Sequence, residues 1–324
     1  MPLHHSDKHN IAVVIPCYKV SKHILKVLSS IGPEVQRIYV IDDKCPEGSG
    51  KLAEDNCKDE RVSVIFNQKN QGVGGAVMSG YKRACDEGAT VIVKIDGDGQ
   101  MDPKLIPIFS APLLDGTADY TKGNRFFDLK MIRQMPNIRI FGNASLSFMT
   151  KFSSGYWDIF DPTNGYTAIH ASIAKLLPFE KISSRYFFET DMLFRLNTLR
   201  AVVIDIPMHA HYSNEVSNLK IKNIFGEFIY KHIRNTFKRI FYSYYLRDMS
   251  IASIELPISI ALMLFGIVFG GWHWLSSFQQ NISTPIGTVM LSTLAILMGL
   301  QLFLAFLSYD IRSVPKLPLH KRLS

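Results

Sequence analysis

The first hundred residues alternate between short apolar runs and segments with helical periodicity. Beginning with an apolar run, these stretches are 11–18, 21–31, 37–43, 50–57, 61–67, 72–88 and 90–98. A short continuous apolar run is typical of a buried strand, and strands that alternate with helices indicate parallel βαβ units. We therefore expect an α/β fold with a doubly wound, Rossmann-like sheet, in which Ser21 caps the first helix.

After residue 100 the pattern is less regular, although a helix is predicted within 185–200. Aromatic residues Phe187 and Phe188 face a core there, and Glu189 and Asp191 lie on the same helix. Carboxylates on a helix that borders a site can act as bases, orient neighbouring groups, or pair locally. The sequence leaves these roles open for both residues.

A strongly amphipathic segment occupies 216–250. Its apolar residues recur every three or four positions, while Lys231, Arg234 and Lys238 share another face. Basic amphipathic helices rich in aromatic residues lie at membrane interfaces, so we expect an interfacial helix. The alternative is a helix that packs on the preceding domain.

The chain between Leu256 and Tyr309 contains no Lys, Arg, Asp or Glu, which a water-exposed surface would not tolerate. Segments 251–275 and 284–309 are each long enough to span a bilayer, and the link between them is short and uncharged. We therefore expect the region 251–309 to form two transmembrane helices in a hairpin, followed by a basic cytoplasmic tail at 310–324.

The formal charge of +8 is concentrated on both sides of this hairpin. Basic clusters can bind nucleic acid, but beside membrane spans they mark the cytoplasmic face and its anionic lipids. Residues 1–10 have no apolar signal sequence, so we expect a tail there and a cytoplasmic domain at 11–215. We predict a multi-pass protein of the inner or plasma membrane that binds membrane lipids and no nucleic acid.

An Asp-x-Asp motif ends the fourth predicted strand. Asp96 and Asp98 flank Gly97, and Gln100 follows two residues later. Ligands of doubly wound sheets bind beyond the carboxyl ends of the strands, where Asp42 and Asp43 also lie. Two carboxylates in that place suit Mg²⁺ or Mn²⁺ bridging a diphosphate.

The glycine-rich segment "NQGVGGA" at 70–76 opens the third predicted helix. It can form a phosphate cradle at a helix N-terminus, or a tight helix start that packs on the sheet. It is neither a dinucleotide fingerprint nor a P-loop, because no G-x-G-x-x-G follows the first strand and no Gly-Lys-Ser/Thr is present. Dinucleotide oxidation and ATP hydrolysis by those routes are disfavoured.

Several motifs in order resemble the family 2 glycosyltransferases of the GT-A fold, and among them the polyprenyl-phosphate sugar synthases. The motifs are "VVIPCY", "VIDD", "NQGVGGAVMSG", "KIDGDGQMDP", "GNRF", "DPTNGY" and "FFETDML", followed by the amphipathic segment and the apolar hairpin. The resemblance covers nearly the whole chain. Departures from the family pattern are Lys44 and Cys45 in "DDKC", Thr167 in "NGYTA", and the segment 209–220.

The resemblance implies a role for each motif. The predicted nucleotide-sugar site comprises Pro16, Tyr18, Asp42, Asp43, Asn70, Gly72, Asp96, Gly97, Asp98 and Gln100. Asp96, Asp98 and Gln100 are expected to hold the metal and the diphosphate. Arg125 and Arg139 match basic residues that grip the lipid phosphate, which guanidinium groups bind with two parallel hydrogen bonds; each could instead be a surface or membrane-facing charge.

These features predict an inverting transferase that moves one sugar from a nucleotide diphosphate to a polyprenyl phosphate. The donor is expected to be a UDP-sugar, with GDP-sugars as the other option, and the acceptor undecaprenyl or dolichyl phosphate. A phosphate is already anionic, so no strong base is needed, whereas a hydroxyl acceptor would require Asp191 or Glu189 as the base. The product would supply a lipid-linked sugar for cell-envelope glycan or lipid modification.

Two alternatives stay open. One is a glycosyltransferase with a hydroxyl acceptor on a glycan or glycolipid, and the other is a non-catalytic membrane scaffold that keeps a nucleotide-sugar fold. The sequence also leaves open whether the protein forms a homo-oligomer.

Overall fold

The computed structural model describes residues 10–127, 137–209 and 221–323, without the side chains of 137–139 and 221–225. The chain divides into two compact units. The first comprises residues up to Thr236 together with Pro315–Ser324, and the second is Phe237–Val314.

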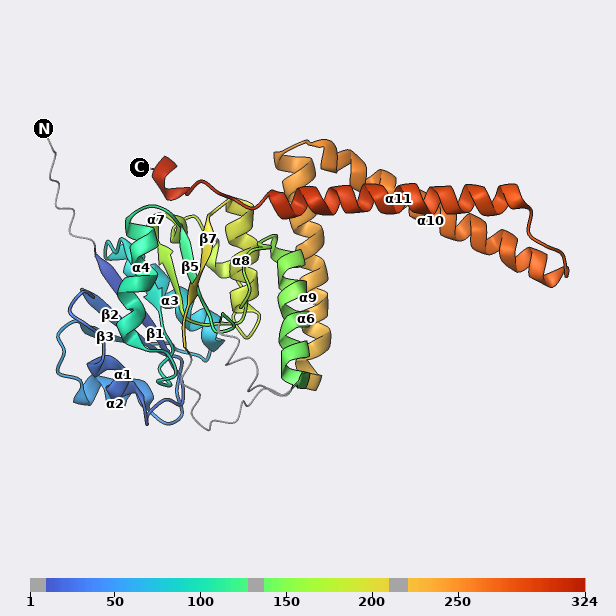
Figure 1. The fold of residues 1–324 in the computed structure, drawn as a ribbon. Helices are drawn as coiled ribbons and strands as arrows, with labels where there is room; N and C mark the ends of the chain where they lie inside the picture. Colours follow the sequence, from blue (N-terminus) through green and yellow to red (C-terminus); the bar gives the residue numbers. More distant parts are fainter. Residues whose placement is uncertain (1–9, 128–136, 210–220, 324) are drawn as a thin grey trace, which may run out of the picture. The chain divides into compact units, whose positions relative to one another are not determined.

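The first unit is built on a seven-stranded sheet (Figure 1). Its strands are β1 (Ile11–Cys17), β2 (Arg37–Asp42), β3 (Val62–Phe66), β4 (Val91–Lys94), β5 (Tyr120–Asn124), β6 (Thr167–His170) and β7 (Val203–Pro207). They lie in the order β3-β2-β1-β4-β6-β5-β7. The first four are mutually parallel, as predicted, and β6 runs antiparallel to both β4 and β5.

Helices cover both faces of the sheet (Figure 1). The described helices up to Leu199 are α1 (Ile24–Ser29), α2 (Ser49–Asn56), α3 (Gly72–Asp86), α4 (Ile106–Leu114), α6 (Asn137–Ser154), α7 (Ala171–Ala174) and α8 (Phe188–Leu199), with short 3-10 turns η1 (Pro103–Leu105) and η2 (Phe179–Lys181). Helix α6 packs on α8 rather than on the sheet (Figure 1). One hydrophobic core joins α1, α2 and α4 to a face of the sheet. Helix α3 packs on β1 so closely that a Cβ at Gly80 would lie 2.3 Å from Val14 Cγ1.

Two local predictions are wrong. Helix α1 begins at Ile24 without a side-chain cap, and the Ser21 hydroxyl lies 2.9 Å from the hydroxyl of Ser49 instead. The fourth strand ends at Lys94 rather than at residue 98, because its pairing with β6 stops where Lys94 faces Thr167. Asp96 and Asp98 therefore lie on a loop beyond the strand.

The C-terminal residues fold back onto the first unit through Asp119, which is fully buried. Its carboxylate accepts backbone hydrogen bonds from Val202, Leu319 and His320 at 2.7, 2.7 and 2.9 Å. The His320 ring also lies 2.6 Å from the same carboxylate and stacks on His170 with 4.3 Å between ring centroids. One buried acid thus holds the tail against the sheet.

Helix α9 (Ile221–Phe241) belongs partly to each unit, and a π-helical turn at Tyr242–Arg247 follows it. It lies within the amphipathic segment and exposes Tyr230, Ile233 and Phe237. The segment 209–220, which departs from the family pattern, lies outside the described part of the chain except for His209.

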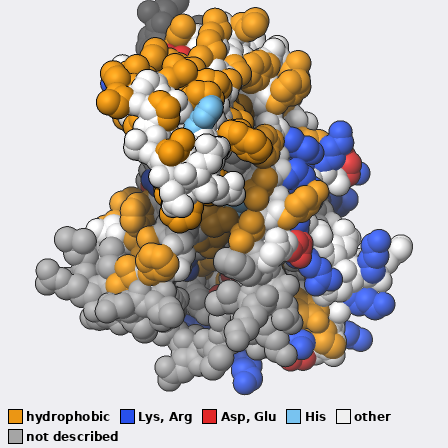
Figure 2. Space-filling view, turned by 90° about the vertical axis from the view of Figure 1, so that its right-hand side faces the viewer, with side chains coloured by type: hydrophobic (Ala, Val, Ile, Leu, Met, Phe, Trp, Pro, Cys, Tyr) orange, Lys and Arg blue, Asp and Glu red, His pale blue; other side chains and the backbone are white. Residues whose placement is uncertain are grey.

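The second unit contains the two long helices α10 (Ile251–Gln279) and α11 (Ile286–Arg312), which pack along each other. Glycines allow the contact, since a Cβ at Gly266 or Gly299 would lie 2.6 Å from Ile296 or Met263, respectively. Both helices are long and apolar enough to cross a membrane. Hydrophobic side chains cover much of the surface of this hairpin that faces the viewer in Figure 2.

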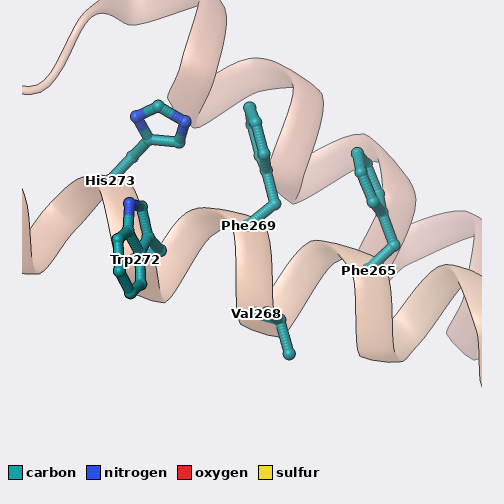
Figure 3. Close-up of a pocket in the computed structure, with 5 residues that line it drawn as sticks. All are labelled: Phe265, Val268, Phe269, Trp272 and His273. Carbon is teal, nitrogen blue, oxygen red and sulfur yellow. The ribbon is translucent and has the colours of Figure 1, made fainter.

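One face of α10 carries a ladder of rings (Figure 3). Phe265 stacks on Phe269 at 5.2 Å between centroids, and Phe269 meets His273 edge-on at 4.6 Å. Figure 3 shows these three rings on the same side of the helix, with Val268 on the other. The imidazole of His273 is an amphipathic ring near the end of this apolar helix, a position that suits a membrane interface.

Replacing Asp119 with alanine should destabilise the first unit, because it removes the acceptor of a buried amide and detaches the tail. We expect a loss of about 3 kcal/mol, the usual cost of leaving a buried group without its partner. For a unit of this size that is roughly 5–10 °C in melting temperature, measurable by thermal unfolding in detergent. Asp115→Ala, at an exposed site nearby, is the control, and equal melting temperatures would contradict the role given to Asp119.

Candidate active site

The predicted site residues gather at one edge of the sheet. Strands β1, β2 and β4 are parallel, so their carboxyl ends lie side by side. Pro16 is half-buried near the end of β1, and Tyr18 follows with 43% of its surface exposed, so its ring is accessible for stacking. Asp43 follows β2, and Asp96 follows β4 after one intervening residue.

Asp42 builds the turn that follows β2. One carboxylate oxygen accepts the Cys45 amide and the other the Gly50 amide, both at 2.8 Å. Gly50 is required for this contact, because a Cβ there would lie 2.5 Å from the Asp42 side chain. The contact of Asp42 with a nucleotide stays a prediction, and its buried carboxylate already organises the loop beside the site.

The glycine-rich start of α3 is held by protein groups. The Asp43 carboxylate accepts the amides of Gln71 and Gly72 at 2.8 and 2.7 Å, and the Ser184 carbonyl accepts those of Gly74 and Gly75 at 2.9 and 3.3 Å. The Asn70 side chain donates to the Asp43 carbonyl at 3.2 Å. Four amides of the proposed phosphate cradle are therefore occupied, which favours the tight helix start.

The Asp-x-Asp loop is shaped by its own residues. Asp98 accepts the Gln100 amide at 3.0 Å, and Gly99 between them has a φ of +78°, which favours glycine. Gly97 is buried, and a Cβ there would lie 3.1 Å from Val20. The side chains of Asp96, Asp98 and Gln100 are all partly exposed on this loop.

These residues fit a divalent cation that a substrate shares. No group of three or more His, Cys, Asp and Glu that could enclose a metal occurs among the described residues. Two carboxylates and an amide supply oxygen ligands but cannot complete the coordination of Mg²⁺ or Mn²⁺ by themselves. Phosphate oxygens of a nucleotide diphosphate would supply ligands that the protein lacks.

Two buried lysines, which our sequence interpretation did not select, lie behind the motif. Lys94, at the end of β4, is 1% exposed and pairs with Asp96 at 2.7 Å. Lys122 on β5 is fully buried and donates to the Asn164 carbonyl at 2.5 Å, and burial lowers its pKa to about 8. The signal for Lys94 was a lysine within the apolar run "VIVKI", which a buried strand tolerates only with a partner, whereas Lys122 stands in the polar sequence "DYTKGNRF" and carried no such signal.

Glu189 and Asp191 face different surroundings although both lie on α8. Burial raises the pKa of Glu189, while Lys94 and Lys122 oppose that rise. Asp191 is fully buried and accepts hydrogen bonds from the Ser183 amide at 2.8 Å and the Asn235 side chain at 3.1 Å. Glu189 is thus the one in electrostatic range of the Asp-x-Asp motif, and Asp191 ties α8 to α9.

Arg125 follows β5 and forms a two-bond ion pair with buried Asp161, at 2.7 and 2.9 Å. Its side chain is 23% exposed, so its orientation is set by the protein while part of it reaches the surface. The binding of a lipid phosphate by Arg125 stays a prediction. The side chain of Arg139, at the start of α6, lies outside the described part of the structure.

Solved structures share this fold. Glucosyl-3-phosphoglycerate synthase from Mycobacterium tuberculosis, in complex with Mn²⁺, UDP and glucosyl-3-phosphoglycerate, superimposes with a TM-score of 0.51 at 16% identity, covering 71% of this chain and 80% of that one. The same enzyme has been solved with Mg²⁺ and UDP, with a TM-score of 0.50. At this identity the likeness shows the GT-A fold alone.

Curated relatives match at the sequence level. The UDP-N-acetylglucosamine–dolichyl-phosphate N-acetylglucosaminyltransferase of Methanococcus voltae is 27% identical over 217 residues, which is 63% of this chain and 86% of that protein. The undecaprenyl-phosphate mannosyltransferase of Micrococcus luteus is 27% identical over 204 residues, which is 61% of this chain and 82% of that protein. The polyprenol monophosphomannose synthase of Mycolicibacterium smegmatis is 27% identical over 203 residues, which is 60% of this chain and 75% of that protein.

The family model described as glycosyl transferase family 2 matches residues 12–177, more than half of the 324 residues. This region includes the Asp-x-Asp loop, both buried lysines and the Arg125–Asp161 pair. The protein is therefore a glycosyltransferase and belongs to glycosyl transferase family 2.

Proposed function

We propose that the protein transfers one sugar from a nucleotide diphosphate sugar to a polyprenyl phosphate, with inversion at the anomeric carbon. The observation that carries the proposal is the combination of a partly exposed Asp-x-Asp loop at the carboxyl edge of the sheet with an apolar helical hairpin in the same chain. The named acceptors of the relatives, dolichyl, undecaprenyl and polyprenol phosphates, support it.

Donor binding would use the edge of the sheet next to β1 and β2. Tyr18 offers an exposed ring for the base, and Asp43 holds the nearby start of α3 in place. Asp96, Asp98 and Gln100 would hold Mg²⁺ or Mn²⁺, which would neutralise charge on the departing diphosphate. The UDP-sugar in the name of the Methanococcus voltae relative supports a uridine donor, and GDP-sugars are the other option.

The acceptor phosphate would be positioned by Arg125, whose guanidinium is oriented by Asp161. A phosphate oxygen is anionic near neutral pH, so alignment with the anomeric carbon contributes more than removal of a proton. Asp191 has both carboxylate oxygens engaged, which argues against a role as the base. Transfer to phosphate does not require one.

The hairpin would hold this site at the cytoplasmic face of the cell membrane, with α9 at the interface. Exposed Phe and Tyr side chains on α9 can enter the headgroup region, and its basic residues favour anionic lipids. The phosphate of a long-chain lipid could then reach the site without leaving the bilayer.

The direct test is incubation of detergent-purified protein with undecaprenyl phosphate, Mg²⁺ or Mn²⁺, and a panel of UDP- and GDP-sugars. Mass spectrometry should detect a lipid heavier by one glycosyl unit with one donor, only when metal is present. Nucleotide binding without any lipid product would contradict the acceptor assignment.

Asp98→Ala should lower the turnover number by roughly 10²–10³-fold, because it removes stabilisation of charge that develops in the transition state. The measurement is product formation at saturating donor and acceptor. Asp102→Asn is the matched control, since the Asp102 side chain caps η1 by accepting the Lys104 amide and is not among the proposed metal ligands. Similar turnover in both variants would exclude the assigned role of Asp98.

The role of Arg125 needs a variant that does not leave Asp161 buried and unpaired, which would itself be destabilising. We expect Arg125→Met combined with Asp161→Asn to raise the KM for polyprenyl phosphate at least about tenfold, the loss of one charge-assisted contact. The KM for the donor should change little. Asp161→Asn alone, which keeps the guanidinium, is the control, and equal effects on both KM values would refute the assignment.

The surroundings of Glu189 favour one alternative function, transfer of the sugar to a hydroxyl group. Burial raises the pKa of Glu189, which suits the general base that a hydroxyl acceptor would need. With a phosphate acceptor, Glu189→Gln should keep the turnover number within about tenfold, whereas loss of a general base costs roughly 10²–10⁴-fold. The comparison is made with undecaprenyl phosphate as acceptor at saturating donor. A loss in the larger range would move the assignment towards a hydroxyl acceptor.

A further inference from the structure

Lys94 occupies a place where a strand would ordinarily carry an apolar side chain. The three residues before it on β4 are fully buried, and Lys94 itself is 1% exposed. Its ammonium does not reach water but lies 2.7 Å from Oδ1 of Asp96. A buried ammonium needs a partner, so this ion pair and the path of the loop after β4 depend on each other.

The space around this ammonium is made by a glycine. A Cβ at Gly165 would lie 2.4 Å from Lys94 Nζ and 2.8 Å from Asp96 Oδ2. The adjoining Asn164 carbonyl accepts the ammonium of Lys122. The "DPTNGY" segment therefore contacts both buried lysines: Gly165 lies against Lys94 and Asp96, and Asn164 accepts the ammonium of Lys122.

Four charges from four elements lie together at this point. Asp96 lies on the loop after β4, Lys94 on β4, Lys122 on β5 and Glu189 on α8. Glu189 is within electrostatic range of the other three. Asp161 and Asp205 also lie within electrostatic range of Lys122. The removal of any one of these charges changes the net charge beside the motif by one unit.

We propose that Lys94 is a positioning residue for the Asp-x-Asp motif: it holds Asp96 through Oδ1 and supplies the positive charge that lets the loop accept a metal–nucleotide diphosphate of net negative charge. This inference rests on the proposed function and adds a residue to it. The site is therefore exposed to two charges, the negative charge of Asp96 and the positive charge of Lys94 behind it.

The sign of the expected effects follows from charge alone. A free divalent cation is repelled by Lys94, whereas the complex of Mn²⁺ with UDP or GDP carries more negative than positive charge and is attracted. Loss of the lysine should therefore strengthen binding of the bare metal and weaken binding of the complex. A lysine that only stabilised the fold would not change the two affinities in opposite directions.

The experiment measures binding, not turnover. Full-length Lys94→Met in detergent is titrated with Mn²⁺ alone, followed by the electron paramagnetic resonance signal of free Mn²⁺, and with UDP or GDP at fixed Mn²⁺ by calorimetry. We expect Mn²⁺ alone to bind about tenfold more tightly and the nucleotide about tenfold more weakly than in the wild type, as expected for one partly screened charge. Lys104→Met, at an exposed lysine ten residues away, should change neither.

Glu189→Gln provides the opposite change of charge in the same cluster and does not require Lys94→Met to fold. It should bind Mn²⁺ alone more weakly and the nucleotide complex more tightly. The proposal is overturned if both affinities shift in the same direction in Lys94→Met, or if neither shifts; should that variant not fold, unchanged affinities in Glu189→Gln overturn it. If the wild type binds neither UDP nor GDP, the proposed function fails, and the titration with Mn²⁺ alone still tests Lys94.

Discussion

The burial of charge at the carboxyl edge of the sheet is the constraint on which the catalytic unit depends. Lys94 and Lys122 cannot reach water, and each is tolerated because an oxygen lies against its ammonium, Asp96 for one and the Asn164 carbonyl for the other. Those oxygens belong to the loops that form the site. Stability and loop geometry are therefore coupled, since a change in either loop would leave a cation buried without a partner.

Several motif residues act on the protein before they can act on a substrate. Asp42 and Asp43 accept backbone amides in the loops after β2 and before α3, and Asp161 orients Arg125. A carboxylate that accepts two amides fixes a loop at a defined position, which is the condition for presenting other groups to a ligand. The motif residues of this sequence therefore hold the loops of the site in place, in addition to any contact that they make with a ligand.

The alternation of apolar runs and helical segments was enough to predict the parallel half of the sheet and to place the Asp-x-Asp motif at its carboxyl edge. The charge-free apolar run predicted the two long helices, because both patterns are local in the sequence. The alternation could not predict that β6 runs antiparallel between β4 and β5, since strand direction is set by distant pairing. Nor could it distinguish a phosphate cradle from a closed helix start. That distinction depends on the Ser184 carbonyl, more than a hundred residues away along the chain.

The two units also constrain how the apolar hairpin can lie in a membrane. The chain leaves the first unit after Thr236 and re-enters it at Pro315, and the returning tail is held by buried Asp119. Within the second unit, the charge-free run ends at Asp310, which is buried and paired with Arg239 at 2.6 Å and with the Tyr244 hydroxyl. The start of α10 and the end of α11 thus both connect to the first unit. If one helix crosses a bilayer the other must cross back, which is the topology that the flanking basic residues favour.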